Sequence, residues 1–232
     1  MHFGSGMADI EQEKRRAAAR SLDLVRDGMC LGLGSGSTAT IMLELLGERV
    51  RAGLRIRGVP TSEASRCLAE QWGIPLTDFD HVDRLDLTID GADEVDHDLN
   101  LIKGGGGALL REKIVASVSD QVVIVADSRK RVQQLGHFAL PVEVVRFAWK
   151  PIAVRVRQLG CTVQLRCQPD GQPFETDEGN FILDCNFDRI RDPRQTARVL
   201  DAMPGVMEHG LFVDVAHVLM IARGSQVEVY ER

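Results

Sequence analysis

The chain has 232 residues, of which 44% are hydrophobic and 5% aromatic, and its 34 acidic and 28 basic side chains leave a formal net charge of −6. This length suits one or two domains, and the apolar share excludes a wholly disordered chain. The net negative charge and the scarcity of aromatic rings argue against a nucleic-acid partner, because nucleic acids are ordinarily bound by a basic face or by stacking aromatic rings. The 22 glycines must either end structural elements or line a site.

Cysteine usage predicts a reducing compartment, and we therefore expect the protein in the cytoplasm. The cysteines are odd in number, form no C-x-x-C pair and stand in apolar stretches, which favours buried free thiols. They are Cys30, Cys67, Cys161, Cys167 and Cys185. No apolar run approaches the roughly 18 residues of a membrane-spanning helix, and no signal peptide is visible, so no membrane partner is expected. Residues 1–6, before Met7, are left out of the fold prediction.

The first part of the chain alternates short apolar runs with segments of helical periodicity. Helices are predicted at 10–26, 40–46, 63–72 and 108–117, and strands at 29–33, 54–59, 85–89 and 122–126. Strands that alternate with helices at this rhythm imply right-handed crossovers. The sequence therefore predicts an α/β fold with a parallel sheet and helices on both faces.

From about residue 138 the order changes to β-α-β-β-α-β, which is typical of a split, ferredoxin-like α+β unit. Its elements are predicted at 139–145, 151–159, 162–167, 180–185, 194–203 and 206–212. Strands at 217–222 and 226–231 then form a final pair, which we expect to return to the first sheet. The predicted domains are residues 7–137 plus 213–232, with 138–212 inserted between them.

The motifs that carry chemistry all fall where a predicted parallel strand ends, which is where ligands bind in such sheets. Four loops are therefore expected to share one cleft. They are residues 34–38, 61–65, 90–93 together with 103–107, and 127–130.

The first loop is rich in glycine and opens a helix, so its amides and hydroxyls can point at an anion. Its spacing is G-x-G-x-G, whereas a dinucleotide site needs G-x-G-x-x-G followed by an acidic residue at the end of the second strand. A nucleotide P-loop would need Lys-Ser/Thr after the glycines. A small phosphate monoester fits better, and a structural turn with a serine cap is the alternative.

Asp90 and Asp93 stand three residues apart at a strand end, where facing carboxylates can share acid–base and hydroxyl-binding work. An EF-hand counted from Asp96 would need glycine at its sixth place and glutamate at its twelfth, but these hold Leu101 and Gly107, which excludes calcium. We expect residues 94–98 to be a solvated loop. The six histidines show no metal-ligand spacing, so no metal is predicted.

The run Lys103-Gly104-Gly105-Gly106-Gly107 is the least ordinary feature, because four glycines lose much backbone entropy on folding and let the backbone approach a ligand. Lys103 can neutralise a developing oxyanion. Glu112, early in the next helix, is a candidate base. The alternative for Glu112 is a surface ion pair with its neighbours Arg111 and Lys113.

Together these motifs resemble the ribose-5-phosphate isomerase A family, in its order and spacing, from about Lys14 to the C-terminus. The matching segments are residues 33–39, 61–65, 90–94, 103–113 and 141–144. The resemblance implies a Rossmann-like domain with an inserted ferredoxin-like domain. It also implies a homodimer or homotetramer that interconverts D-ribose 5-phosphate and D-ribulose 5-phosphate in the non-oxidative pentose phosphate pathway, without metal or cofactor.

The resemblance also implies a role for each matching residue. Glu112 would be the base that moves a proton between C2 and C1 through an enediolate, and Lys103 with the adjoining amides of Gly104, Gly105 and Gly106 would stabilise that enediolate. Asp90 and Asp93, with Gly91 and Ala92 between them, would bind sugar hydroxyls and assist ring opening. The other end of the substrate would contact Ser35, Gly36, Ser37, Thr38 and Lys130.

Two positions depart from the family pattern: Ser35 stands where threonine is common, and Gly107 where alanine is common. Both keep the chemistry. A sugar-phosphate-sensing regulatory domain is an alternative, but it would ordinarily carry a DNA-binding helix-turn-helix, and only about 28 residues precede the first strand. An amino-sugar phosphate deaminase or a lactonase on a related fold is another alternative, but neither should carry both signature motifs.

Overall fold

The computed structural model describes residues 3–232, which form two compact units. The first unit runs to Ala92 and also takes Arg111–Lys130 and Val215–Arg232, whereas the second takes Asp93–Leu110 and Arg131–Asp214. Of residues 1–6, which the fold prediction set aside, residues 1 and 2 lie outside the described part, and the first helix, α1 (Phe3–Ser21), begins directly after them.

The first unit contains a six-stranded sheet whose order is β13-β12-β6-β3-β1-β2. Its strands are β1 (Cys30–Leu33), β2 (Arg57–Pro60), β3 (Leu87–Asp90), β6 (Val122–Asp127), β12 (Val218–Arg223) and β13 (Gln226–Glu231). All neighbours are parallel except β12 and β13, which form an antiparallel hairpin at the edge. The predicted α/β class, and the return of the C-terminal strands to this sheet, are confirmed.

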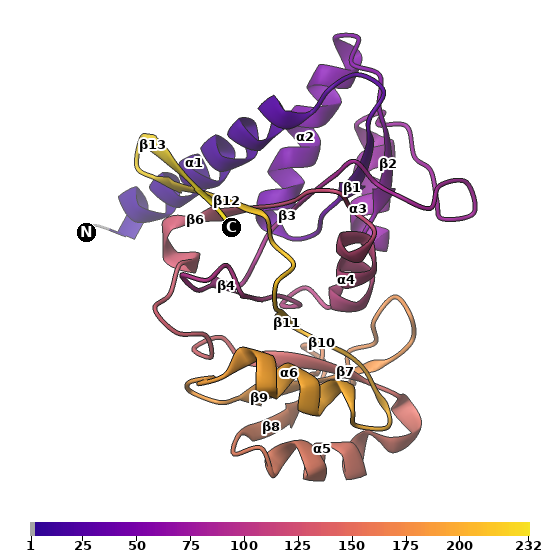
Figure 1. Cartoon of the computed structure of the whole chain (residues 1–232), viewed down its shortest axis with the longest axis vertical. Helices are drawn as coiled ribbons and strands as arrows, with labels where there is room; N and C mark the ends of the chain where they lie inside the picture. The colour runs from indigo at the N-terminus through magenta and orange to yellow at the C-terminus, as the bar shows by residue number, and fades with distance from the viewer. Residues whose placement is uncertain (1–2) are drawn as a thin grey trace. The chain divides into compact units, whose positions relative to one another are not determined.

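Helices cover both faces of this sheet because its central strands are apolar on both sides. The other helices are α2 (Ser37–Arg51), α3 (Glu63–Gln71) and α4 (Leu109–Ser117), with short 3-10 turns η1 (Leu22–Leu24) and η2 (Ser128–Lys130). Leu31 and Leu33 pack in one core with residues of α1 and α2, which lie side by side in Figure 1. Cys30 points to the opposite face and shares a second cluster with Val115 of α4.

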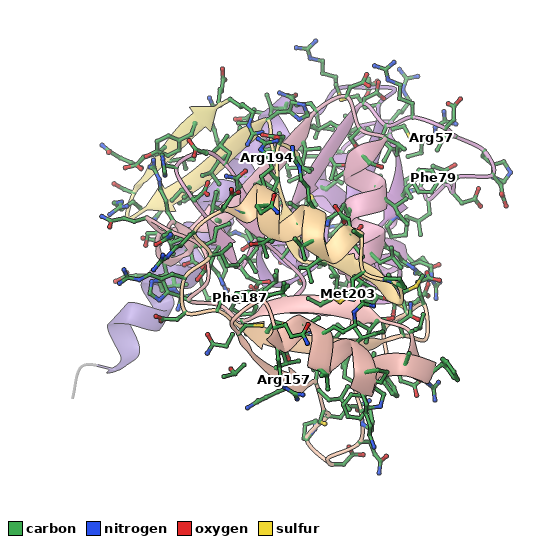
Figure 2. The ribbon with its side chains drawn as sticks, turned by 60° about the horizontal axis from the view of Figure 1, so that its bottom comes forward. Arg57, Phe79, Arg157, Phe187, Arg194 and Met203 are labelled. Carbon is green, nitrogen blue, oxygen red and sulfur yellow. The ribbon has the colours of Figure 1, made fainter. Side chains whose placement is uncertain are left out.

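The second unit is built on a four-stranded antiparallel sheet with the order β10-β7-β9-β8. Its elements are β7 (Leu140–Val144), η3 (Arg146–Ala148), α5 (Trp149–Arg157), β8 (Thr162–Leu165), β9 (Phe181–Asn186), α6 (Pro193–Asp201) and β10 (Val206–His209). They follow the predicted β-α-β-β-α-β order. Val142 and Val144 pack in an apolar core that takes in Met203, after α6, and Phe187, after β9, both labelled in Figure 2.

A small three-stranded sheet, β11-β5-β4, completes the second unit and corrects the sequence prediction at two places. Its strands are β4 (Glu94–Val95), β5 (Leu101–Ile102) and β11 (Leu211–Phe212). The single strand expected at 206–212 is wrong, because the chain leaves one sheet for the other at Gly210. There the Gly210 N–H donates to the carbonyl of Pro141 at 2.7 Å, and its own carbonyl accepts from the Lys103 N–H at 2.9 Å.

The expectation of a solvated loop at 94–98 is also wrong for two of its acids. Glu94 is buried and accepts hydrogen bonds from the N–H groups of Gly136 at 2.7 Å and Phe138 at 2.6 Å. Asp96 is buried and accepts from the N–H groups of Asp98 and Asn100. Each carboxylate can be buried because it meets backbone donors that would otherwise lack partners.

Two of the five cysteines depart from the expected burial. Cys30, Cys161 and Cys185 are buried free thiols, but Cys67 on α3 and Cys167 after β8 are exposed. Among the described residues, no helix combines the length and the apolar character that a membrane crossing needs.

Candidate active site

In the first unit, the loop after β1 is held so close to β3 that a side chain would not fit at one of its glycines. A Cβ on Gly34 would lie 2.3 Å from Asp90 Oδ1 and 2.5 Å from the carbonyl oxygen of Ile89. Gly36 has φ of +90° and caps the N-terminus of α2, which begins with Ser37. The amides of the first helical turn have no partner within the helix, so this terminus can bind an anion.

Asp90 ties this loop to the end of β3. The side chain is buried, and its Oδ1 accepts hydrogen bonds from the Ser35 N–H at 2.9 Å and the Gly91 N–H at 2.7 Å. The Ser35 amide is therefore already hydrogen-bonded within the protein, and the amides from Gly36 onward are the candidates to bind a ligand.

A cluster of four hydroxyls lies beneath the same loop. Ser35 Oγ is 2.7 Å from Thr61 Oγ1, 2.7 Å from Ser62 Oγ and 2.9 Å from Ser65 Oγ. Thr61 donates its proton to the Leu33 carbonyl and Ser65 to the Gly34 carbonyl. Because Thr61 and Ser65 use their hydroxyl protons in these bonds, the Ser35 hydroxyl is the donor within the cluster, to Ser62. This hydroxyl thereby holds the loops after β1 and β2 together.

Glu112 stands in the first turn of α4 and is only 5% exposed. Its neighbour Arg111 pairs with Glu63 of α3 at 2.9 Å. The alternative of a surface ion pair is therefore wrong for Glu112, because the residue is not on the surface.

Lys130 lies at the end of η2, and a buried carboxylate from α1 supports the start of that turn. Glu13 Oε2 accepts from the N–H of Ser128 at 3.0 Å and from its hydroxyl at 2.7 Å, while Oε1 accepts from the Gly224 N–H at 2.8 Å. Burial raises the pKa of Glu13, but the bonds from Gly224 and Ser128 outweigh it and hold that pKa below the usual range.

In the second unit, Lys103 is 3% exposed, although it carries a charged side chain. Its N–H donates to the Gly210 carbonyl, and its Nζ lies 5.5 Å from the centroid of the Phe212 ring. An ammonium over an aromatic face is a favourable contact. Lys103 is thus a buried cation at the head of the glycine run.

The glycines after Lys103 form a tight turn closed by a 3.0 Å bond from the Gly107 N–H to the Gly104 carbonyl. Gly104 and Gly107 have φ of +101° and +83°, which other residues rarely adopt. The Gly105 N–H donates to Asp93 Oδ2 at 2.8 Å. The second aspartate of the motif therefore contacts the turn, whereas Asp90 contacts the loop after β1.

The predicted residues thus fall into two sets, one in each unit. The first unit holds Ser35, Gly36, Ser37, Thr38, Asp90, Gly91, Ala92, Glu112 and Lys130, and the second holds Asp93, Lys103, Gly104, Gly105 and Gly106. The sequence prediction included the loop 61–65 but not its hydroxyls as residues of the site, and it missed Glu13. The T-S-x-x-S spacing after a strand could have indicated the hydroxyl cluster, whereas no feature of the sequence near Glu13 indicates its role.

Among the residues that the structure describes, Asp201, Glu208 and His209 have ligand atoms close enough to hold a metal ion. The Leu211 N–H donates to His209 Nδ1 at 3.2 Å, so the ring proton is on Nε2, 3.0 Å from Asp201 Oδ1. A metal at Nε2 would require the opposite tautomer. The group is better described as a histidine–carboxylate hydrogen bond.

Comparison with known proteins gives one consistent result. Residues 57–226 match the family model of ribose 5-phosphate isomerase A (phosphoriboisomerase A). The chain is 54% identical over 230 residues to the ribose-5-phosphate isomerase A of Rhodopseudomonas palustris (strain TIE-1), covering 97% of this chain and 99% of that relative.

Solved structures agree with the sequence matches. A D-ribose-5-phosphate isomerase in complex with phospho-erythronic acid is 40% identical, with a TM-score of 0.93, over 96% of this chain and 99% of that one. The ribose 5-phosphate isomerase A of Methanocaldococcus jannaschii is 35% identical, with a TM-score of 0.91, over the same shares. Both resemble this chain over nearly its whole length.

Proposed function

The chain belongs to the ribose-5-phosphate isomerase A family and interconverts D-ribose 5-phosphate and D-ribulose 5-phosphate, and we propose that it does so by proton transfer through an enediolate. The observation that carries this proposal is that the motifs that match the family hold a buried carboxylate, Glu112, and a buried ammonium, Lys103. One group can move a proton, and the other can stabilise the negative charge that the transfer creates.

In the proposed reaction, Glu112 removes the proton from C2 of the open-chain aldose and delivers it to C1, while the hydroxyl proton of O2 passes to O1, so that C2 becomes the carbonyl carbon. The negative charge develops on the oxygens of the enediolate between these steps. Lys103 and amides of the glycine turn stabilise that negative charge. General base catalysis contributes about 10²–10⁴-fold, and oxyanion stabilisation of roughly 3–4 kcal/mol supplies a comparable factor.

The two aspartates are proposed to bind the sugar hydroxyls and to assist ring opening. Asp90 is held by the amides of Ser35 and Gly91, and Asp93 by the amide of Gly105. Hydrogen bonds from backbone N–H groups fix each carboxylate in place before substrate arrives. The intervening Gly91 and Ala92 are proposed to pass close to the sugar.

The phosphate is proposed to bind at the N-terminus of α2, on the amides of Gly36, Ser37 and Thr38 and on the hydroxyls of Ser37 and Thr38, with Lys130 as a cationic partner. A helix N-terminus favours an anion. Ser35 serves the same site by holding the loop, since its amide and hydroxyl proton are both engaged within the protein.

The chemistry of the ligand in the solved structure with phospho-erythronic acid supports the proposed enediolate intermediate. That ligand is a phosphorylated sugar acid, and its planar carboxylate resembles the enediolate in shape and charge. Analogues of a transition state or high-energy intermediate bind tightly to sites built for that charge.

An assay of the purified protein with ribose 5-phosphate in the presence of EDTA tests the mechanism. We propose that no metal or cofactor takes part, and ribulose 5-phosphate should therefore form at an undiminished rate. Turnover only after a divalent metal is restored would overturn the cofactor-free mechanism, and no turnover under either condition would overturn the activity.

We further propose a cytoplasmic homodimer or homotetramer that acts on its phosphosugar alone, without nucleic acid or membrane. The five free cysteines support a reducing compartment, and the net charge of −6 disfavours a polyanionic partner. Light scattering should give two or four times the 25.6 kDa of one chain. A mass of one chain at micromolar concentration would contradict the assembly.

A further inference from the structure

Arg166, which follows β8, joins the glycine turn to β9 in the second unit. Its Nε and Nη2 donate to the two oxygens of Asp184 on β9, at 3.0 and 2.5 Å. Its Nη1 donates to the carbonyls of Gly104 at 2.9 Å and Gly105 at 3.1 Å. All three guanidinium nitrogens thus donate hydrogen bonds, and the side chain is only 14% exposed.

These contacts fix the direction of two consecutive peptide groups. In a trans peptide the C=O and the following N–H point in opposite directions. Because the carbonyls of Gly104 and Gly105 both point to Arg166, the N–H groups of Gly105 and Gly106 point away from it. The Gly105 N–H meets Asp93 Oδ2 at 2.8 Å. The Gly106 N–H is the next amide on that side of the turn.

From this geometry we infer that Arg166 is a positioning residue, which orients the glycine turn so that the Gly106 N–H is the backbone donor to the enediolate oxygen. The inference rests on the proposed function and sharpens it, because it selects one amide of the four-glycine run. The Gly105 amide has a different task, which is to hold Asp93.

The side chain of Arg166 is suited to this task by its shape. A guanidinium presents donors in a planar fork, which can span a carboxylate on one side and two carbonyls on another. A lysine ammonium is a single point and cannot serve all of these acceptors. Asp184 in turn sets the plane of the fork, and the Phe174 ring, 5.8 Å from the guanidinium carbon, packs beside it.

The test compares wild type, Arg166→Lys and the control Arg155→Lys, an exposed arginine on α5 of the same unit. Misorienting an oxyanion donor costs on the order of 10²-fold in rate. We expect Arg166→Lys to lower kcat about 10- to 100-fold with KM changed less than threefold, and Arg155→Lys to change neither. An unchanged kcat in Arg166→Lys would overturn the inference.

Two inhibitors separate positioning from a general loss of structure. Phospho-erythronic acid carries the planar anion, and the corresponding alcohol, erythritol phosphate, does not. Arg166→Lys should weaken binding of the acid at least tenfold and leave the alcohol within about twofold. Equal weakening of both ligands would show that Arg166 merely supports the fold, and would overturn the inference.

Asp184→Asn provides a second route if Arg166→Lys does not fold. It keeps Arg166 but removes the charge that sets its plane, so we expect the same selective weakening of the acid, by about three- to tenfold. No selective effect in a folded Asp184→Asn would count against the inference. Failure of the proposed function is recognised separately, because wild type itself would then bind the acid no more tightly than the alcohol.

Discussion

At the scale of single residues, the proposed site depends on charged and polar groups that are buried. Lys103 and Glu112 are 3% and 5% exposed, and Asp90 accepts two backbone N–H groups. Burying a charged group has a large cost unless hydrogen bonds or an opposite charge offset it.

Replacing Glu112 by glutamine should remove most of the activity without disturbing binding. Glutamine keeps the shape of the side chain but cannot accept and return the C2 proton. We expect kcat to fall by about 10²–10⁴-fold with KM little changed, measured by steady-state kinetics on ribose 5-phosphate. A large rise in KM with kcat intact would make Glu112 a binding residue instead.

Replacing Ser35 by alanine and replacing Ser37 by alanine should have different effects, although the two serines stand only two residues apart. Ser35→Ala removes the hydrogen bond that the Ser35 hydroxyl donates within the cluster, so we expect a stability loss of about 0.5–1.5 kcal/mol by urea unfolding. Ser37→Ala changes an exposed hydroxyl at the N-terminus of α2, so we expect a raised KM with stability unchanged. The reverse pattern would place Ser35 on the substrate.

At the scale of elements, tight turns rather than helices or strands carry most of the site. The turn 104–107 depends on glycine for two reasons, backbone conformation and space. Gly107 has φ of +83°, and a Cβ there would lie 2.5 Å from Cε1 of Phe174. The Phe174 ring therefore leaves little space for a side chain at Gly107.

Gly107→Ala should therefore destabilise this protein, and part of the loss should be relieved by Phe174→Ala. Left-handed backbone costs an alanine roughly 1–2 kcal/mol, and the contact with the ring adds to this. Urea unfolding of both single variants and the double variant measures the coupling. Additive effects in the double variant would show that the ring moves aside without cost.

At the scale of the whole molecule, the two units should respond to pH in opposite directions. In the first unit, burial raises the pKa of Asp127, but the hydrogen bonds from Arg129 outweigh burial and lower that pKa. The pKa of Glu13 is lowered in the same way by its hydrogen bonds. In the second unit, burial raises the pKa of Glu143 on β7. One Glu143 oxygen accepts from Thr176 and Asn180, and the other is buried with no hydrogen-bond partner among the described residues.

The signs follow from linkage between protonation and folding. A lowered pKa stabilises the folded state above the unfolded pKa, and this stabilisation is lost as pH falls. A raised pKa favours the folded state below the unfolded value of 4.5, and that stabilisation is lost as pH rises. We therefore expect Glu143→Gln to gain stability relative to wild type between pH 4.5 and 7.

Urea midpoints of wild type, Glu143→Gln and Glu13→Gln, measured from below pH 4.5 up to pH 7, provide the test. Glu13→Gln should lose stability relative to wild type at pH 7 and lose less as pH falls below 4.5. The two variants thus serve as controls for each other. A Glu143→Gln difference that does not change with pH would mean that Glu143 is ionised at no cost.

Much of this architecture could be predicted from the sequence because it follows from local patterns. Apolar runs such as Val122–Asp127 form strands, and a glycine loop directly before a helix, as at Gly36, predicts an anion site. The buried state of Glu94 could not be predicted, because its donors at Gly136 and Phe138 lie more than 40 residues away. The end of β10 at Gly210 was missed for the same reason, since Pro141 and Lys103 hold that glycine.

The sequence by itself determined the alternation of strands and helices, the family and the identities of the residues proposed to react, since each rests on contiguous motifs. Only the tertiary structure decided which way those motifs point. That Ser35 faces inward, and that Arg166 turns two glycine carbonyls toward itself, depends on partners supplied by distant segments. Residue types set what chemistry is available, and long-range hydrogen bonds set its direction.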